Sequence, residues 1–169
     1  MTPTAASRRE ETHVPQPRDT PTQVHRARLP ELAPATLYAL LRLRVDVFVV
    51  EQRCPYPELD GRDGEPGTEH LWLDDEAGPT SYLRLLVDPG HTRRIGRVCT
   101  RGDARGRGLA TTLLTAALER AGQDAVVLDA QSHLAPWYAK AGFEVAGPQF
   151  VEDGIPHVPM RRPASTVKT

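Results

Sequence analysis

Ten residues near the middle of the chain, RGDARGRGLA at 101–110, combine arginines and glycines in a pattern that suits binding of an anion. Gly106 and Gly108 lack a Cβ, so a ligand can approach the backbone closely there. The apolar spacing that follows predicts a helix from about Gly108 to Ala121, and the first turn of a helix leaves four backbone N–H groups without partners. A helix N-terminus also carries a partial positive charge of about half a unit. Residues 105–110 therefore predict a phosphate-binding loop that opens a helix.

The residues of the first helical turn support the same interpretation. No Asp or Glu occurs between Ala104 and Leu118. An ordinary helix favours an acidic residue in its first turn, or a Ser, Thr, Asp or Asn cap, and here the backbone donors stay available to an anion. The alternative for these glycines is a tight turn that binds no ligand.

Two other phosphate-binding loops fit the residues less well. A P-loop requires Lys followed by Ser or Thr after its glycines, and neither follows Gly108. A dinucleotide-binding fold requires G-x-G-x-x-G, but Thr111 occupies the third glycine position. Asp129 follows about twenty residues after the glycines, as it would in that fold, yet the chain has only one such strand–helix–strand unit.

Composition and charge argue against several partners. The net charge is −1, and no aromatic residue for base stacking occurs between positions 91 and 107, so the RGRG segment does not indicate nucleic-acid binding. No apolar run of about 18 residues predicts a membrane span. The start of the chain lacks the apolar segment of a signal peptide, so the tripeptide at 101–103 has no adhesion context and we expect a cytoplasmic protein. Cys54 and Cys99 have no paired metal-ligand spacing, and we expect no metal site and no disulfide.

The chain has 169 residues, which is enough for one domain. Residues 1–22 contain few large apolar side chains, cannot offset the entropy of ordering, and predict a disordered tail. Residues 23–162 predict a single domain, and residues 163–169 predict a flexible C-terminal tail.

Hydrophobic spacing predicts the elements of this domain. One apolar stripe predicts a helix over 34–51; it consists of Leu37, Leu40, Leu41, Val45 and Phe48. Prolines and glycines predict a long loop over 53–67, and Gly122 fits the end of the central helix. Strands are expected at 24–29, 93–100, 125–130, 143–147 and 157–162, with a hairpin at 69–88 and a short helix at 135–141. This order predicts an α/β (α+β) layer fold with a mixed, mostly antiparallel sheet flanked by helices.

Two motifs resemble the signature of the GNAT N-acetyltransferases. Arg105-x-x-Gly108-x-Ala110 after a strand is similar to their Q/R-x-x-G-x-G/A segment, which binds acetyl-CoA. WYAKAGFEV at 137–145 is similar to their Y-x-x-x-G-F segment. The order of elements over roughly 24–162 also resembles the GNAT acyl-CoA N-acyltransferase fold. Segments at 37–61, 82–86, 95–98 and 152–160 resemble the ElaA-like branch of that family.

The resemblance implies where the co-substrate acetyl-CoA would bind. Its pyrophosphate would lie on the loop that consists of Arg105, Gly106, Arg107, Gly108, Leu109 and Ala110. Its pantetheine arm would lie between strands 95–100 and 125–130 and pair with the backbone of Val98 and Thr100. Many GNAT proteins have Asn at the position of Gln131, which keeps the amide and is a further candidate contact.

The resemblance also implies that an acceptor amine attacks the acetyl carbonyl directly, and that coenzyme A leaves as a thiolate. Tyr138 is the candidate general acid, because a phenol with an ordinary pKa near 10 is protonated at neutral pH. The alternative is a core tyrosine packed beside Trp137.

A general base is expected as well, because an amine of pKa about 10.4 requires roughly 4 kcal/mol for deprotonation at pH 7.4. His157 and His70 are preferred, since histidine titrates near neutrality. The other candidates are Glu51, Glu69 and His133. Arg84 alternates with Tyr82 and Leu86 along one strand face, and it is a candidate for binding an anionic group of the acceptor; a surface arginine is the alternative.

We therefore expect an acetyl-CoA-dependent N-acetyltransferase that acts on a small-molecule or protein amine. The alternative is an acyl-CoA-binding regulatory module of the same fold without turnover. An exposed edge strand near the C-terminus could pair two copies into a homodimer.

Overall fold

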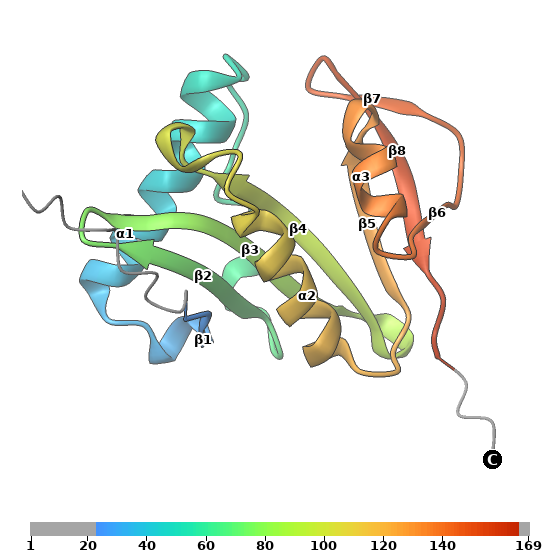
Figure 1. Cartoon of the computed structure of the whole chain (residues 1–169), viewed down its shortest axis with the longest axis horizontal. Helices are drawn as coiled ribbons and strands as arrows, with labels where there is room; N and C mark the ends of the chain where they lie inside the picture. Colours follow the sequence, from blue (N-terminus) through green and yellow to red (C-terminus); the bar gives the residue numbers. More distant parts are fainter. Residues whose placement is uncertain (1–22, 166–169) are drawn as a thin grey trace, which may run out of the picture.

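A computed structural model describes residues 23–165 of the chain. The tail predicted at 1–22, and residues 166–169 of the tail predicted at the C-terminus, lie outside this range. The described residues form one eight-stranded sheet in the order β1-β2-β3-β4-β5-β8-β6, and β7 also pairs with β8 (Figure 1). Among the described strands only the β4–β5 pairing is parallel, so the predicted mixed, mostly antiparallel sheet is confirmed.

The strands follow the predicted order with one addition. They are β1 (His25–Ala27), β2 (Glu69–Asp75), β3 (Gly78–Asp88), β4 (Thr92–Thr100), β5 (Val126–Gln131), β6 (Glu144–Val145), β7 (Phe150–Glu152) and β8 (Ile155–Arg162). The short strand β7 was not expected. It exists because Asp153 and Gly154 both adopt positive φ and turn the chain tightly into β8.

Within residues 23–165, three α-helices accompany the sheet: α1 (Pro34–Val45), α2 (Leu109–Ala121) and α3 (Ala135–Ala139). The predicted helix over 34–51 is helical throughout, but its hydrogen bonding widens to a π-helix at Asp46–Glu51 (η2). Short 3-10 helices occur at Leu29–Glu31, Arg62–Gly64 (η3), Pro89–His91, Gly102–Ala104 and Ser132–Leu134. Helix α2 begins at Leu109 rather than Gly108, because the cap residue Gly108 is left-handed.

Strand alternation divides the core between the two faces of the sheet. Leu83 and Leu85 of β3 pack in the larger cluster with α2, β5 and α3, whereas Tyr82 of β3 packs in the smaller cluster with α1. Helix α2 therefore crosses one face of the sheet, and α1 covers the other (Figure 1).

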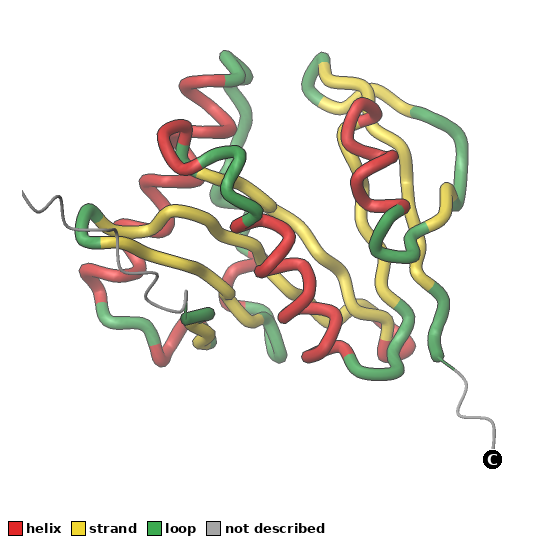
Figure 2. Tube along the Cα trace, in the orientation of Figure 1, coloured by secondary structure: helices red, strands yellow, loops and turns green. Residues whose placement is uncertain are grey.

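Strands β4 and β5 separate after a short parallel contact. They pair only at Arg93 with Val126 and at Arg94 with Val127, and from there their upper ends run apart (Figure 2). Strand β4 also carries an extra residue opposite Tyr82–Arg84 of β3, and Arg97 there has a positive φ of 56°. A bulge of this kind bends the strand, so beyond Arg94 the side of β4 that faces β5 has no strand partner in the described chain.

Candidate functional site

A cavity of about 720 Å³ lies where β4 and β5 separate. Val98 of β4, Gln131 of β5, Tyr138 of α3 and His157 of β8 all line it. Residues that the sequence places up to 59 positions apart, from 98 to 157, thus meet in one place because the sheet opens between its two halves. A concave pocket of this size is the usual place for a small-molecule site, and charged side chains such as Asp60, Arg84 and Arg97 also line this one.

The loop before helix α2 has the conformation expected of a phosphate site. Gly106 and Gly108 have φ values of 74° and 76°, which glycine adopts without strain. A Cβ built on either residue meets no atom within 4 Å, so open space lies beside the backbone. The Thr112 N–H donates to the Gly108 carbonyl, and no side chain in the described structure caps this helix end. The N–H groups of 109–111 therefore have no helical partner.

The side chains of this loop differ in their burial and in their partners. Leu109 is buried in the larger core cluster and fixes the start of α2, while Arg107 is exposed and Ala110 is half-buried. Arg105 has a defined partner: its Nη1 and Nη2 each lie 2.7 Å from a carboxylate oxygen of Glu51, and its Nε donates to the Thr100 carbonyl at 3.1 Å. Glu51, one of the other candidate bases, is therefore the ion-pair partner of Arg105.

Tyr138 lies at the inner wall of the cavity. Its residue is 6% exposed, and its ring meets the rings of Trp137 and Phe143 edge to face, with centroids 4.6 Å and 5.9 Å away. Burial raises the pKa of its phenol above the ordinary value of 10. Tyr138 thus packs in the core beside Trp137 and also lines the cavity, so its role as a general acid stays a prediction.

His157 and Gln131 are cross-strand partners on β8 and β5. The Nδ1 of His157 lies 2.9 Å from the Ile155 carbonyl, and because a carbonyl only accepts, Nδ1 carries the proton in the neutral ring. The Nε2 atom is then the basic nitrogen. Gln131 donates from Nε2 to the side-chain oxygen of Gln52 at 3.2 Å, which joins the two sides of the cavity.

His70, the other preferred base, does not reach the cavity. Its residue is buried on the α1 face of β2, with Nδ1 2.7 Å from the Tyr82 hydroxyl and Nε2 3.2 Å from the Asp63 carbonyl. Both ring nitrogens are therefore occupied, and burial lowers the pKa of His70. The sequence could not show this, because Tyr82 lies on the next strand.

Arg84 lines the cavity, but its charge is already compensated. Its Nη1 donates to Asp60 at 2.8 Å and to Asp63 at 2.9 Å, and its Nη2 donates to Asp60 at 2.6 Å. It is a buried structural arginine rather than the surface residue of the alternative interpretation. The sequence did not identify Asp60 and Asp63 as partners of Arg84. The prolines and glycines around them predict a loop over 53–67 but give no sign that this loop buries charge.

The remaining candidates lie elsewhere. Glu69 forms hydrogen bonds with Arg120 at 2.9–3.1 Å, and His133 is exposed outside the cavity.

Cys54 lines the cavity and donates to the Asp153 carbonyl at 3.2 Å, whereas Cys99 is a core residue whose pKa burial raises to about 12. Both cysteines are free thiols.

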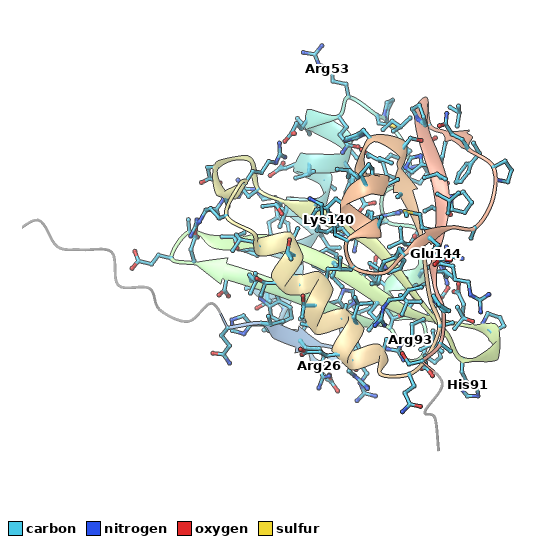
Figure 3. The ribbon with its side chains drawn as sticks, turned by 45° about the vertical axis from the view of Figure 1, so that its right-hand side comes forward. Arg26, Arg53, His91, Arg93, Lys140 and Glu144 are labelled. Carbon is cyan, nitrogen blue, oxygen red and sulfur yellow. The ribbon has the colours of Figure 1, made fainter. Side chains whose placement is uncertain are left out.

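A second cavity, of about 620 Å³, lies between α2 and α3. Trp137, Lys140 and Thr115 are among the residues that line it, and Figure 3 labels Lys140 beside the end of α3. Across residues 23–165, no three His, Cys, Asp or Glu side chains are grouped as a metal site would require. In the same range, no helix is long and apolar enough to cross a membrane.

The paired carboxylates predict that the protein loses stability in acid. Burial alone would raise the pKa of Asp63, but hydrogen bonds and charge from Arg44 and Arg84 lower it below the ordinary value of 3.8. A carboxylate with a depressed pKa stabilises the fold above its ordinary pKa, and this stability is lost as the pH falls from that value through the lower pKa of the folded state. We expect the Tm to fall progressively below about pH 5, by about 3 °C for each kcal/mol lost.

Thermal unfolding of Asp63→Asn between pH 7 and 3 checks this expectation. The variant should be less stable than the wild type at pH 7 and should show a shallower decline in acid. Asp124→Asn is the control, because Asp124 forms no ion pair with the other described residues. Equal acid slopes for the wild type and Asp63→Asn would contradict the assignment.

Comparison with known proteins agrees with this geometry. The family model described as an acetyltransferase (GNAT) domain matches residues 44–163. The UPF0039 protein Rv2851c of Mycobacterium tuberculosis is 51% identical over 139 residues, which cover 80% of this chain and 89% of that protein. Protein ElaA of Escherichia coli is 39% identical over 140 residues, which cover 78% of this chain and 90% of ElaA.

Solved structures show the same fold. An acyl-CoA N-acyltransferase from Pseudomonas aeruginosa superposes with a TM-score of 0.79 and 41% identity, over 83% of this chain and 99% of that one. The structure of Escherichia coli ElaA superposes with a TM-score of 0.78 and 34% identity, over 83% and 99% of the two chains. The protein therefore belongs to the GNAT acetyltransferase family, in its ElaA-like branch.

Proposed function

We propose that the protein transfers the acetyl group of acetyl-CoA to a primary amine of a small molecule or protein. The observation that carries the proposal is that Tyr138 lines the cavity where β4 and β5 separate, in a fold whose helix α2 also begins with unpaired N–H groups. Membership of the GNAT family supports acyl-CoA as the donor. That the acyl group is acetyl and that the acceptor is an amine are parts of the proposal.

The residues present fit this co-substrate. The backbone of Gly106–Ala110 would hold the pyrophosphate, with Arg105 beside it. The unpaired side of β4 at Val98 and Thr100 would pair with the amides of the pantetheine arm, because these backbone groups face the separated β5. Gln131, at the end of β5, would contact the same arm.

The proposed chemistry moves two protons. The acceptor amine attacks the acetyl carbonyl carbon, and the carbon–sulfur bond breaks. Tyr138 donates its phenolic proton to the departing sulfur, and Nε2 of His157 takes the proton that the amine loses. The position of Tyr138 at the cavity and the donor role of His157 Nδ1 support these two assignments. His70 has no part in this scheme, since both of its ring nitrogens bind within the protein.

Two measurements test the proposal together. Acetyl-CoA at millimolar concentration should raise the Tm by several degrees through ligand linkage, and free thiol should appear when a primary amine is added. A Tm shift without thiol release from any amine of a broad panel would favour the binding module without turnover. No Tm shift would contradict acyl-CoA binding.

The cytoplasmic location and the homodimer stay predictions from the sequence.

A further inference from the structure

Beside the cavity, three arginines and three carboxylates form a closed ring of alternating charge. Each member pairs with two of the others, and the order around the ring is Arg44, Glu58, Arg97, Asp60, Arg84, Asp63 and back to Arg44. The nitrogen–oxygen distances include 2.5 Å for Arg44–Glu58, 2.7 Å for Arg44–Asp63, 2.6 Å for Arg84–Asp60 and 3.2 Å for Arg97–Asp60. The ring has no net charge.

The two kinds of charge in the ring come from different parts of the fold. All three carboxylates belong to one segment, residues 58–63, within the loop at 55–68 between η2 and β2. The arginines belong to three separate elements: Arg44 to α1, Arg84 to β3 and Arg97 to the bulge of β4. The loop contains only the short helix η3. The ring therefore joins an irregular loop to three rigid elements.

Arg44 is the member of the ring farthest from solvent. Its residue is 0% exposed, and that of Glu58 is 4% exposed. Arg44 holds the loop at two places, because Nε and Nη2 donate to the carboxylate and carbonyl of Glu58 while Nη1 donates to Asp63. Buried charges of this kind are tolerated only when they are paired. Loss of Arg44 would leave Glu58 with Arg97 alone and Asp63 with Arg84 alone, so three carboxylates would share two arginines.

The loop that Arg44 holds forms one wall of the cavity. Asp60, Arg84 and Arg97 line it, together with Tyr56. The Tyr56 hydroxyl donates to Glu58 at 2.9 Å, and the guanidinium of Arg97 lies 5.5 Å from the centre of the Tyr56 ring. Arg44 itself does not line the cavity. Any effect of Arg44 on a bound acceptor must therefore pass through its ring partners.

We propose that Arg44 is a positioning residue that fixes the loop at 55–68 as the acceptor-side wall of the cavity. That this wall contacts the acceptor rests on the proposed function, whereas the ring of ion pairs does not depend on it. It replaces the expectation that Arg84 binds an anionic acceptor group, since both terminal nitrogens of Arg84 are occupied by carboxylates.

The experiment compares four variants with the wild type: Arg44→Met, Arg44→Lys, Asp60→Asn and the control Arg28→Met. Arg28 also pairs with a carboxylate, that of Glu31, but both side chains are exposed and outside the cavity. The first readout is deuterium exchange of the backbone at 55–68. The second is kcat/KM for thiol release with propylamine and with β-alanine, measured beside the dissociation constant of coenzyme A.

We expect Asp60→Asn to raise deuterium exchange at 55–68 at least tenfold and to lower kcat/KM for both amines about tenfold, with the dissociation constant of coenzyme A unchanged within twofold. Arg44→Met should do the same more strongly, and Arg44→Lys should restore part of the loss. Arg28→Met should change none of these quantities. Asp60→Asn covers the case in which Arg44→Met fails to fold.

Two outcomes would overturn the proposal. Unchanged exchange at 55–68 in Asp60→Asn would show that the ring does not fix the loop. A gain in kcat/KM confined to β-alanine would show that removal of the Asp60 charge frees Arg84 to bind a carboxylate. If the wild type releases no thiol with any amine, the proposed function fails, while deuterium exchange still decides whether the ring holds the loop.

Discussion

Replacement of Gly108 by glutamate is expected to weaken binding of coenzyme A at least a hundredfold. Gly108 is left-handed at the start of α2, next to N–H groups without a helical partner. A glutamate carboxylate there can accept from these N–H groups itself and repels the pyrophosphate, so the ligand loses both its donors and a favourable field. Isothermal titration with coenzyme A measures the loss directly.

The control must account for the strain of a side chain at positive φ. Gly90 in the β3–β4 turn has a φ of 75°, against 76° for Gly108, and a Cβ at either position meets no atom within 4 Å. Gly90→Glu therefore adds the same charge and a similar strain away from the loop. It should lower the Tm about as much as Gly108→Glu and leave the affinity unchanged. Retention of coenzyme A binding by a folded Gly108→Glu variant would refute the phosphate site.

Replacement of Tyr138 by phenylalanine is expected to lower kcat about a hundredfold and leave the dissociation constant of acetyl-CoA within threefold of the wild type. General acid catalysis contributes on the order of 10²–10⁴ in rate. Phenylalanine keeps the edge-to-face contacts with Trp137 and Phe143 and removes only the hydroxyl. Single-turnover release of free thiol measures the chemical step.

The activity of Tyr138→Phe separates an acid from a packing residue, and a pH profile and a control variant accompany it. Because burial raises the pKa of the Tyr138 phenol above 10, the wild type should keep its acid form through pH 9. Tyr38→Phe is the control, since Tyr38 is 73% exposed on α1. Full activity of Tyr138→Phe would show that Tyr138 is a core residue without a catalytic role. The proton that the departing sulfur receives would then come from water or another group.

Local patterns in the sequence predicted the parts of the fold that depend on local chemistry. The glycines at 106 and 108 and the apolar face of α2 lie within one short segment, and both have the structure that their residues favour. The π-helix after Val45 was not predicted, because the same hydrophobic spacing fits an α-helix that continues to Glu51. The short strand β7 depends on pairing with β8 rather than on its own three residues.

The site was harder to predict wherever a role depends on a distant partner. His70 has the chemistry of a base, but Tyr82 and the Asp63 carbonyl occupy its ring, and neither is adjacent in the sequence. Arg44 follows Leu43 on a helix and gives no sign of complete burial, since its carboxylate partners lie 14 and 19 residues later. Residue type indicated which groups could react, whereas only the fold shows which of them are already paired.

Because the contact between β4 and β5 is short, a small rotation there would be amplified along the rest of β5. Only two residue pairs join these strands, and β5 extends four residues beyond the second pair, to Gln131. At about 3.3 Å per residue this arm is roughly 13 Å long, so a rotation of about 5° at its base moves its tip by about 1 Å. A substitution at Val126 or Val127, far from any reacting group, would therefore change the separation of Tyr138 from the opposite strand.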